Sequence, residues 1–239
     1  MQIKDIEYHA DGARLVGRLF VDEARSDQRP GVLVAPEGLG LSEHTFDIAR
    51  RLAEAGYVAF AMDYYGDGTA LPMDEVMPRL AAFMADPLTV RARASAALAV
   101  LSGQPQTDPS RLAAIGYCFG GTTALELARG GAELKAAIGF HSGLGTTRPQ
   151  DASNIKAKVL VCIGADDPLV ATDARAAFEK EMNEGGVDWR MNLYGGAGHS
   201  FTNPAVNALN RPGFAYHEPT NRRSWRAMLD LFDEVFGAA

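Results

Sequence analysis

The chain has 239 residues, of which 47% are hydrophobic and 22% are charged, and these proportions are ordinary for a soluble globular protein. Its formal net charge of −7 at pH 7 argues against nucleic acid and anionic membranes as partners, because both attract positively charged surfaces. The two cysteines make neither a disulfide framework nor a set of zinc ligands.

The N-terminal segment lacks the apolar core of a signal peptide, and no apolar stretch approaches the ~20 residues of a membrane-spanning helix. A cytoplasmic protein is therefore expected. No linker rich in proline, glycine or serine divides the chain, so residues 1–239 are expected to form a single domain.

Two β-rich segments at the N-terminus, Ile3–His9 and Arg14–Val21, are separated by the hairpin signal Asp11-Gly12 and predict antiparallel edge strands. Strands and helices then alternate. In chain order the predicted elements are the strand Gly31–Ala35, the helix Thr45–Ala55, the strand Tyr57–Met62, a helical stretch Asp74–Leu101 broken near Asp86-Pro87, a turn at Asp108–Arg111, the strand Leu112–Ile115, the helix Thr122–Arg129, the strands Leu134–Phe140 and Lys158–Ile163, the helix Thr172–Glu184, the strand Trp189–Tyr194 and the helix Asn221–Phe236. This alternation predicts an α/β fold with a mostly parallel central sheet, helices on both faces and ligands at the carboxyl ends of the strands.

A short motif in the middle of the chain carries the main chemical signal. Residues Gly116–Gly121, with the sequence GYCFGG, turn the chain from a buried strand into a helix and match the nucleophile elbow, with cysteine in place of serine. The turn directs Cys118 to the N-terminus of the helix, where the dipole and free amides favour a thiolate. The motif predicts Cys118 as a nucleophile; the alternative is a small buried cysteine beside a glycine-rich turn.

A cysteine nucleophile needs a base and a third group that orients the base. In α/β-hydrolases these follow the nucleophile in the order acid, then histidine, each in a loop after its own strand. Asp167 follows the strand Lys158–Ile163, and His199 lies in a glycine-rich loop after the last predicted strand. Asp166 is adjacent, but Asp167 is favoured because Pro168 and a hydrophobic pair follow it, as in the usual acid turn.

Several further residues are candidate substrate contacts. His141 follows a predicted strand and could form part of the pocket wall, although it precedes the acid and so breaks the order expected of the catalytic histidine. Leu39 lies in the glycine-rich loop after the strand Gly31–Ala35, and Phe201 lies two residues after His199.

Together these motifs resemble the dienelactone hydrolase family, a group within the α/β-hydrolases. The matching pieces occur in family order: Pro36-Glu37, Gly116–Gly121, Asp167-Pro168 and Gly198–Phe201. The resemblance implies a Cys-His-Asp triad made of Cys118, His199 and Asp167. It also implies that Glu37 contacts the resting thiol and that the backbone amides of Phe119 and Gly38 form the oxyanion hole.

The glutamate can also be interpreted from its chemistry. A carboxylate repels a thiolate but accepts a hydrogen bond from a neutral thiol, so Glu37 could tune the nucleophile. The alternative is an exposed loop glutamate with no role in catalysis.

One position departs from the family pattern. Members that cleave dienelactone hold its carboxylate with arginines, one of them four residues after the catalytic histidine, where this chain has Asn203. The chain has Arg79, Arg91 and Arg93 in the region of the other arginine, but no motif identifies which one corresponds to it. The loss of a bidentate clamp favours a neutral or aryl ester, or another lactone, over dienelactone.

The sequence therefore predicts a cofactor-free and metal-independent hydrolase that acts on a small-molecule ester or lactone through an acyl-thioester on Cys118. Side activity on uncharged phosphotriesters is a further hypothesis, because amides that receive a carbonyl oxyanion can also receive a phosphoryl oxygen. A thiol-based redox sensor and a non-catalytic ligand-binding protein on the same fold are alternatives. Cys162, in a buried strand, is expected to belong to the core. The sequence leaves the oligomeric state open.

Overall fold

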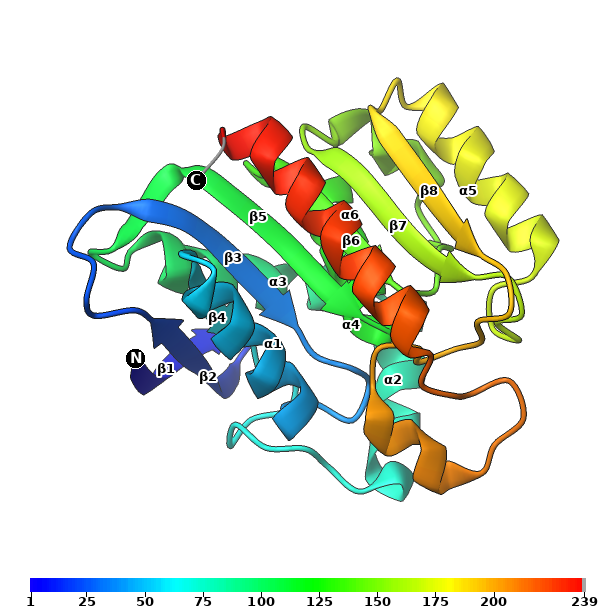
Figure 1. Cartoon of the computed structure of the whole chain (residues 1–239), viewed down its shortest axis with the longest axis horizontal. Helices are drawn as coiled ribbons and strands as arrows, with labels where there is room; N and C mark the ends of the chain where they lie inside the picture. The colour runs from blue at the N-terminus through cyan, green and yellow to red at the C-terminus, as the bar shows by residue number, and fades with distance from the viewer. Residues whose placement is uncertain (238–239) are drawn as a thin grey trace.

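The computed structural model describes residues 1–237. Its centre is an eight-stranded sheet with the order β1-β2-β4-β3-β5-β6-β7-β8 (Figure 1). The strands are β1 (Gln2–Ala10), β2 (Ala13–Val21), β3 (Arg29–Ala35), β4 (Val58–Ala61), β5 (Thr107–Tyr117), β6 (Ala136–Phe140), β7 (Lys158–Gly164) and β8 (Trp189–Tyr194). β2 pairs antiparallel with both β1 and β4, and every other neighbouring pair is parallel. The predicted mostly parallel sheet with an antiparallel N-terminal edge is confirmed.

The N-terminal hairpin forms where the sequence predicts it. Asp11 and Gly12 have φ angles of 51° and 69°, and positive angles at both turn residues match the right-handed twist of the two strands. Of the two hairpin strands only β1 lies at the edge of the sheet, however, because β2 also pairs with β4.

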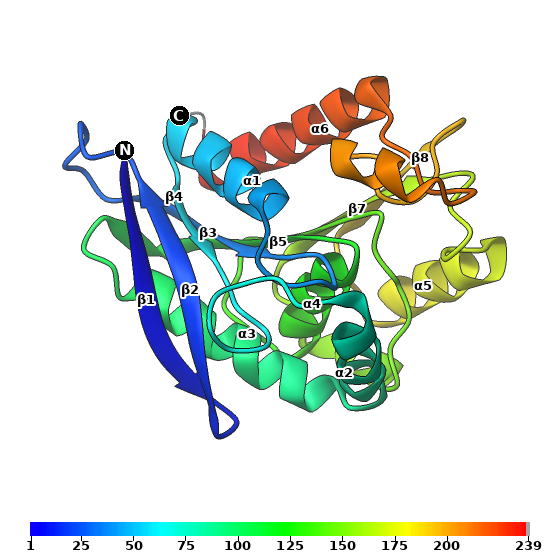
Figure 2. The same ribbon diagram turned by 90° about the horizontal axis from the view of Figure 1, so that it is seen from below.

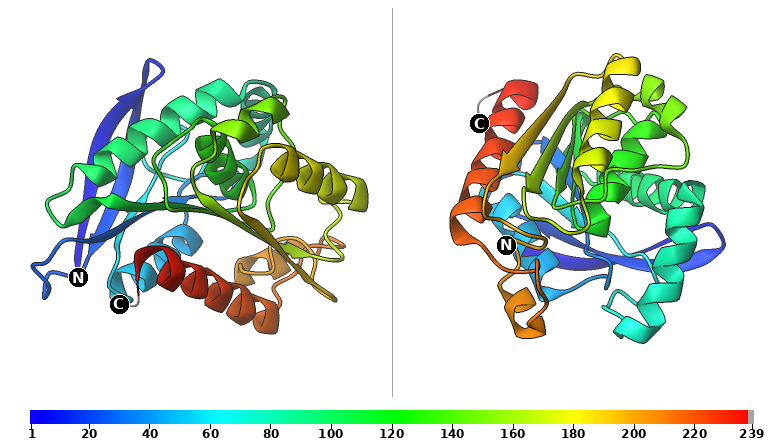
Figure 3. Two further views of the ribbon diagram at one scale, coloured as in Figure 1. Left: turned by 90° about the horizontal axis from the view of Figure 1, so that it is seen from above. Right: turned by 90° about the vertical axis from the view of Figure 1, so that its right-hand side faces the viewer.

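Helices cover both faces of the sheet. The α-helices are α1 (Glu43–Glu54), α2 (Met73–Ala85), α3 (Pro87–Ser102), α4 (Phe119–Arg129), α5 (Thr172–Glu184) and α6 (Glu218–Phe236), and two short 3-10 helices are η1 (Pro149–Asn154) and η2 (Pro204–Leu209). α1 and α6 lie on one face, and α3, α4 and α5 lie on the other (Figures 2 and 3). No helix within residues 1–237 combines the length and the apolar character needed to cross a bilayer.

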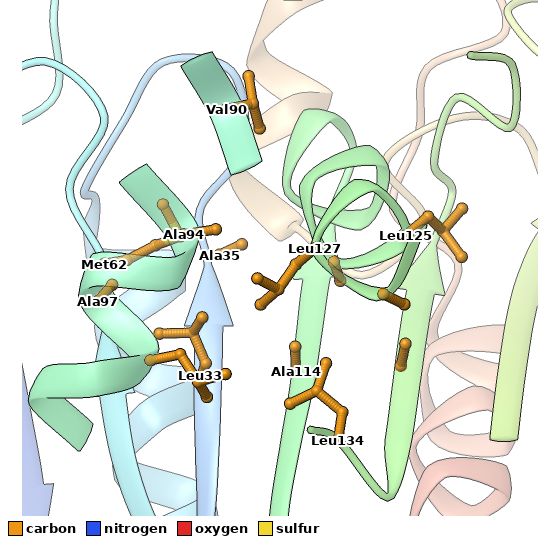
Figure 4. Packing of buried hydrophobic residues seen from close by; sticks show 14 of the residues in the cluster. Leu33, Ala35, Met62, Val90, Ala94, Ala97, Ala114, Leu125, Leu127 and Leu134 are labelled. Atoms are coloured by element: carbon orange, nitrogen blue, oxygen red, sulfur yellow. The ribbon is translucent and has the colours of Figure 1, made fainter. Parts of the chain in front are cut away.

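The core consists of two layers, one on each side of the sheet. In the layer shown in Figure 4, aliphatic side chains of α3 and α4 pack on β3, β4 and β5. Leu33 and Leu125 are each 1% exposed, and full burial of such a side chain is worth roughly 1.5–3 kcal/mol. This packing fixes α4, and with it the turn that precedes α4, on the sheet.

Local chemistry explains several of the element boundaries. Asp86 separates α2 from α3, and its side chain accepts a hydrogen bond from the Leu88 amide at 3.0 Å, as an N-cap does. β5 begins before the predicted turn at 108–111, because the pairing with β3 jumps from Asp108 to Leu112 and the intervening residues bulge out. α6 begins three residues earlier than predicted, with Pro219 in its first turn.

Candidate active site

Cys118 lies in the turn between β5 and α4, in a backbone conformation that residues other than glycine rarely adopt. Its φ and ψ are 54° and −118°, and it caps the N-terminus of α4. The turn is tight: a Cβ on Gly116 would lie 1.9 Å from the Gly120 carbonyl oxygen, and one on Gly120 would lie 2.1 Å from that of Ala35. The strain is therefore held by backbone packing, and Cys118 itself is partly exposed.

Asp167 and His199 come together as predicted, from the loops after β7 and β8. Asp167 Oδ2 lies 2.8 Å from His199 Nδ1, and Asp167 Oδ1 accepts the Leu169 amide at 2.8 Å. Both side chains are buried, whereas Asp166 is exposed to solvent. Since the Asp167 carboxylate is hydrogen-bonded to Nδ1, the other ring nitrogen, Nε2, remains available to give or take a proton.

His199 has a perturbed proton affinity. Burial alone would lower its pKa, but the hydrogen bond to Asp167 and the neighbouring Cys118 thiol outweigh that effect and raise the pKa to about 9. Nε2 is itself buried and accepts no hydrogen bond from residues 1–237. An imidazolium is therefore favoured at neutral pH beside Cys118.

This raised pKa predicts that stability falls as the pH increases through about 9. The unfolded chain loses the histidine proton near its ordinary pKa of about 6.5, so the contribution of His199 is complete below that pH and disappears above the folded-state pKa. Asp167→Asn should lack most of this contribution, because it removes the carboxylate that holds the proton. Asp166→Asn, the matched control, should keep it. Urea unfolding from pH 6 to 10 measures the free energy of unfolding of each protein. If this free energy depends on pH in the same way for wild type and Asp167→Asn, the Asp167–His199 pairing is contradicted.

Within the described residues, Glu37 makes no hydrogen bond to the Cys118 thiol, which is the contact that the family resemblance implies. Its Oε2 instead accepts a hydrogen bond from Asn203 Nδ2 at 2.7 Å and lies 3.5 Å from His44 Nδ1. Burial raises the pKa of Glu37, but His44 and Asn203 more than offset it, so the net shift is downward and the group is a carboxylate. The hydrogen bond from the Asn203 amide thus occupies an oxygen of the carboxylate that the resemblance pairs with the thiol.

The amide of Phe119, at the start of α4, and that of Gly38, in the loop after β3, come from two segments in close contact. Within the described chain, 1–237, neither amide donates a hydrogen bond to the protein. Gly120 packs against the backbone of Ala35 and Pro36, which brings the elbow to the loop that contains Gly38. The Tyr65 hydroxyl donates a hydrogen bond to the Gly38 carbonyl at 2.7 Å and so anchors the loop that contains Gly38.

The candidate substrate contacts divide into two groups. Leu39 is 37% exposed and Asn203 is partly exposed, so both are accessible. Phe201 and His141 are fully buried, and their rings pack edge to face with centroids 5.0 Å apart. Neither side chain reaches solvent in this structure, so a direct contact of His141 or Phe201 with substrate stays a prediction without support from their exposure.

The three arginines that the sequence left unassigned have different surroundings. Arg91 is paired with Glu126 at 2.8 Å and with Asp151 at 2.6 Å, in a half-buried ionic network. Arg93 donates to the carbonyl of Tyr64. Arg79 is exposed on α2, with its guanidinium carbon 5.7 Å from the centre of the Tyr65 ring.

Sequence reasoning missed His44, Tyr65 and Thr202, whose side chains contact Glu37, Gly38 and His141 respectively. Tyr65 had a usable signal, because it follows β4 and therefore lies at the carboxyl edge of the parallel strands, where ligands bind. The roles of His44 and Thr202 depend on side-chain direction, which sequence spacing does not reveal.

Other parts of the molecule can be set apart from this site. Cys162 is fully buried in β7, and burial raises the pKa of its thiol to about 12. Within residues 1–237, no group of three or more histidine, cysteine, aspartate or glutamate side chains is arranged to hold a metal ion. A surface cavity of about 250 Å³ between β8 and α6 contains none of the predicted site residues.

The fold described above agrees with comparisons to known proteins. The model of the dienelactone hydrolase family matches residues 17–236. The chain belongs to the dienelactone hydrolase family. It is accordingly a hydrolase with the α/β-hydrolase fold.

Individual proteins are similar to this chain over most of its length. A solved structure named m3DLH is 48% identical, with a TM-score of 0.95 and 98% of each chain covered. The crystal structure of a dienelactone hydrolase-like promiscuous phosphotriesterase from metagenomic libraries is 42% identical, with a TM-score of 0.93 and the same coverage. A Yersinia pestis protein described as "Putative carboxymethylenebutenolidase" is 30% identical over 228 residues, which cover 88% of this chain and 82% of the relative.

Proposed function

We propose that the protein hydrolyses carboxylic esters or lactones through a thioester on Cys118. The observation that carries this proposal is the buried Asp167–His199 pair, with its second imidazole nitrogen free of protein partners in residues 1–237 and Cys118 close enough to raise the pKa of His199. A nucleophile, a base and an orienting carboxylate in these relations form the unit needed for acyl transfer.

Acylation begins with the Cys118 sulfur, on which the adjacent imidazolium and the N-terminus of α4 favour negative charge. The sulfur attacks the substrate carbonyl, and the new oxyanion accepts hydrogen bonds from the Phe119 and Gly38 amides. As the carbon–oxygen bond to the leaving group breaks, His199 donates its proton to that oxygen. The products of this step are an alcohol or phenol and an acyl-thioester on Cys118.

Deacylation uses the same groups in the opposite direction. Neutral His199 takes a proton from water, and the hydroxide formed in this way attacks the thioester carbonyl. The sulfur leaves as a thiolate beside the regenerated imidazolium, and the acid product departs. The chain supplies every group in the cycle, so the proposal requires no metal or organic cofactor.

Glu37 is proposed to act through charge. The carboxylate is hydrogen-bonded to Asn203 and lies near His44, and its pKa responds to the charge of His199. A buried negative charge near an imidazolium stabilises the protonated ring. In this position Glu37 supports Asp167 in holding the His199 proton.

The substrate is proposed to be uncharged near the reacting carbonyl. Asn203 replaces an arginine, and its amide is already bonded to Glu37, so it provides no cation for a substrate carboxylate. Arg79 is exposed and therefore solvated, which weakens any contact with an anionic group.

A second feature, the apolar stripe of α2, favours apolar substrates. Leu80 borders the oxyanion loop, since a Cβ on Gly38 would meet its Cδ1 at 2.8 Å. Met73, Met77 and Met84 flank Leu80 at helical spacing, and they are 52%, 56% and 65% exposed. Flexible methionine side chains adapt to varied apolar groups. The apolar stripe (Met73, Met77, Leu80 and Met84) is thus suited to the chain or ring of an ester.

A panel of p-nitrophenyl esters tests this substrate class. The kcat/KM value is expected to rise from acetate to hexanoate by up to about fourfold per methylene, the value for full burial of a methylene group. A neutral acyl group should exceed a carboxylate-bearing one of equal length by at least about tenfold. Met77→Gln should weaken the dependence of kcat/KM on the length of the acyl chain. Leu193→Gln, which changes an exposed leucine on β8, should leave this dependence unchanged.

The outcomes separate two parts of the proposal. No hydrolysis of any ester above the Cys118→Ala background would overturn the esterase proposal itself. Hydrolysis with a flat series, or a preference for the anionic ester, would overturn only the substrate class.

A phosphotriester extends the panel, because the 42% identical relative is described as a promiscuous phosphotriesterase. An uncharged p-nitrophenyl dialkyl phosphate fits the same neutral site, and its phosphoryl oxygen can use the same two amides. Repeated turnover by wild type but not by Cys118→Ala is the expected result. Release of a single equivalent of p-nitrophenol would instead mark the triester as an inhibitor that phosphorylates Cys118.

The redox alternative has less support. A disulfide switch needs a resolving thiol that can reach Cys118, but Cys162 is fully buried and its raised pKa opposes thiolate formation. A redox switch also has no need of a buried Asp167–His199 pair.

A further inference from the structure

His141 is the first residue after β6, and it is buried among the loops of the proposed site. Its side chain is 0% exposed and its φ angle is 41°, an uncommon value for a residue with a side chain. The centroids of its ring and the His199 ring are 5.2 Å apart, so the two imidazoles are neighbours. Nothing in the proposed reaction uses His141, although a buried imidazole is costly unless its nitrogens are hydrogen-bonded.

Both ring nitrogens of His141 have partners, and the partners belong to different loops. The Cys118 amide donates to Nδ1 at 3.2 Å, while Nε2 lies 2.8 Å from the Thr202 hydroxyl. An acceptor nitrogen carries no proton, so the proton is on Nε2, which donates to Thr202. Burial, reinforced by the charge of nearby His199, lowers the pKa of His141 well below its usual value and keeps this neutral form.

The two contacts connect the groups whose alignment determines acyl transfer. Cys118 has a strained backbone that costs of the order of 1–3 kcal/mol and persists only where its surroundings hold it. Its amide donates both to His141 and to the Phe140 carbonyl, at 3.0 Å. Thr202 lies three residues after His199 in the same loop.

We infer that His141 is a positioning residue that links the Cys118 elbow to the His199 loop through its two ring nitrogens. This inference rests on the proposed function, because it concerns the alignment of that nucleophile with that base. It assigns His141 no contact with substrate and no part in proton transfer. Its effect is to fix the distance over which the sulfur and the imidazole exchange a proton.

Three substitutions separate the two contacts. His141→Phe keeps a ring that can pack on His199 and Phe201 but removes both hydrogen bonds. His141→Asn retains an acceptor oxygen close to the position of Nδ1 and so keeps the Cys118 contact alone. Thr202→Val preserves the shape of the threonine and removes only the hydroxyl.

The expected effects are on kcat, measured per active site by titration with a p-nitrophenyl ester. His141→Phe should lower kcat by about ten- to a hundredfold, in line with the cost of small misplacements, and change KM by less than about twofold. The alkylation rate of Cys118 by iodoacetamide should fall as well. His141→Asn should recover most of the lost kcat, and His141→Phe combined with Thr202→Val should be no slower than His141→Phe alone.

Other results would overturn the inference. These are a kcat for His141→Phe within twofold of wild type, a His141→Asn variant no faster than His141→Phe, or losses that multiply when His141→Phe and Thr202→Val are combined. If His141→Phe does not fold, an unchanged kcat for Thr202→Val is sufficient to overturn it. Activity that survives in Cys118→Ala would instead refute the proposed function, so the two failures are distinct.

Discussion

Cys118→Ala and His199→Ala are each expected to lower kcat by on the order of a thousandfold or more. Cys118→Ala removes the atom that forms the thioester, and the residual rate should come only from binding and the oxyanion amides. His199→Ala removes the proton donor for the leaving group and the base for water. The double variant should be no slower than the worse single variant, because both side chains act in the same step. Steady-state kinetics with a p-nitrophenyl ester measure all three.

Cys162→Ala provides the matched control for this experiment. It removes the other thiol in the chain, in a core strand, and should leave kcat per folded molecule close to that of wild type. Iodoacetamide should still inactivate Cys162→Ala, since the alkylated group is Cys118. Full activity of Cys118→Ala, or insensitivity of Cys162→Ala to iodoacetamide, would exclude the thioester mechanism.

Gly120→Ala is expected to destabilise the protein and to impair catalysis, although it adds only one methyl group to the elbow. The new Cβ would lie 2.1 Å from the Ala35 carbonyl oxygen and 2.6 Å from that of Pro36, so two backbone segments would have to separate. Overpacking of this kind costs about 3 kcal/mol or more, equivalent to a fall of roughly 6–12 °C in Tm for a chain of this size. The displaced elbow should also lose at least about a hundredfold in kcat/KM.

Gly145→Ala is the control for the added methyl group, because Gly145 lies on an exposed loop and a Cβ there would have no neighbouring atom within 4 Å. It should retain wild-type Tm and activity. A Gly120→Ala protein with normal activity and a Tm within about 2 °C of wild type would show that the elbow can relax, and would remove the steric argument for its glycines.

The sequence predicts those site residues that can be recognised from a single short segment of the chain. Cys118, Asp167 and His199 each follow a parallel strand, and parallel strands place their carboxyl ends together, so chain order is enough to bring the three loops to one edge. The fold is predictable for the same reason, because apolar strands and amphipathic helices alternate throughout.

The parts that the sequence does not predict depend on the direction of single side chains between loops. Glu37 is an example: a carboxylate beside the elbow could reach the thiol, and only the structure shows that the Asn203 amide, at 2.7 Å, is its hydrogen-bond partner. His141 is another, since a histidine after a strand is equally compatible with a pocket wall and with a buried link. Its two hydrogen bonds decide between these possibilities.

The hydrogen bond between Glu37 and Asn203 joins residues 166 positions apart in the chain. Contacts of such long range form late in folding, because the entropy of closing a large loop must be offset before they contribute. A nascent chain that has emerged from the ribosome only as far as α4 would contain the elbow without His199 or the partner of Glu37. Catalytic competence would thus be acquired only after β8 and the loop beyond it have joined the sheet, which makes enzyme activity a sensitive reporter of the last stage of refolding.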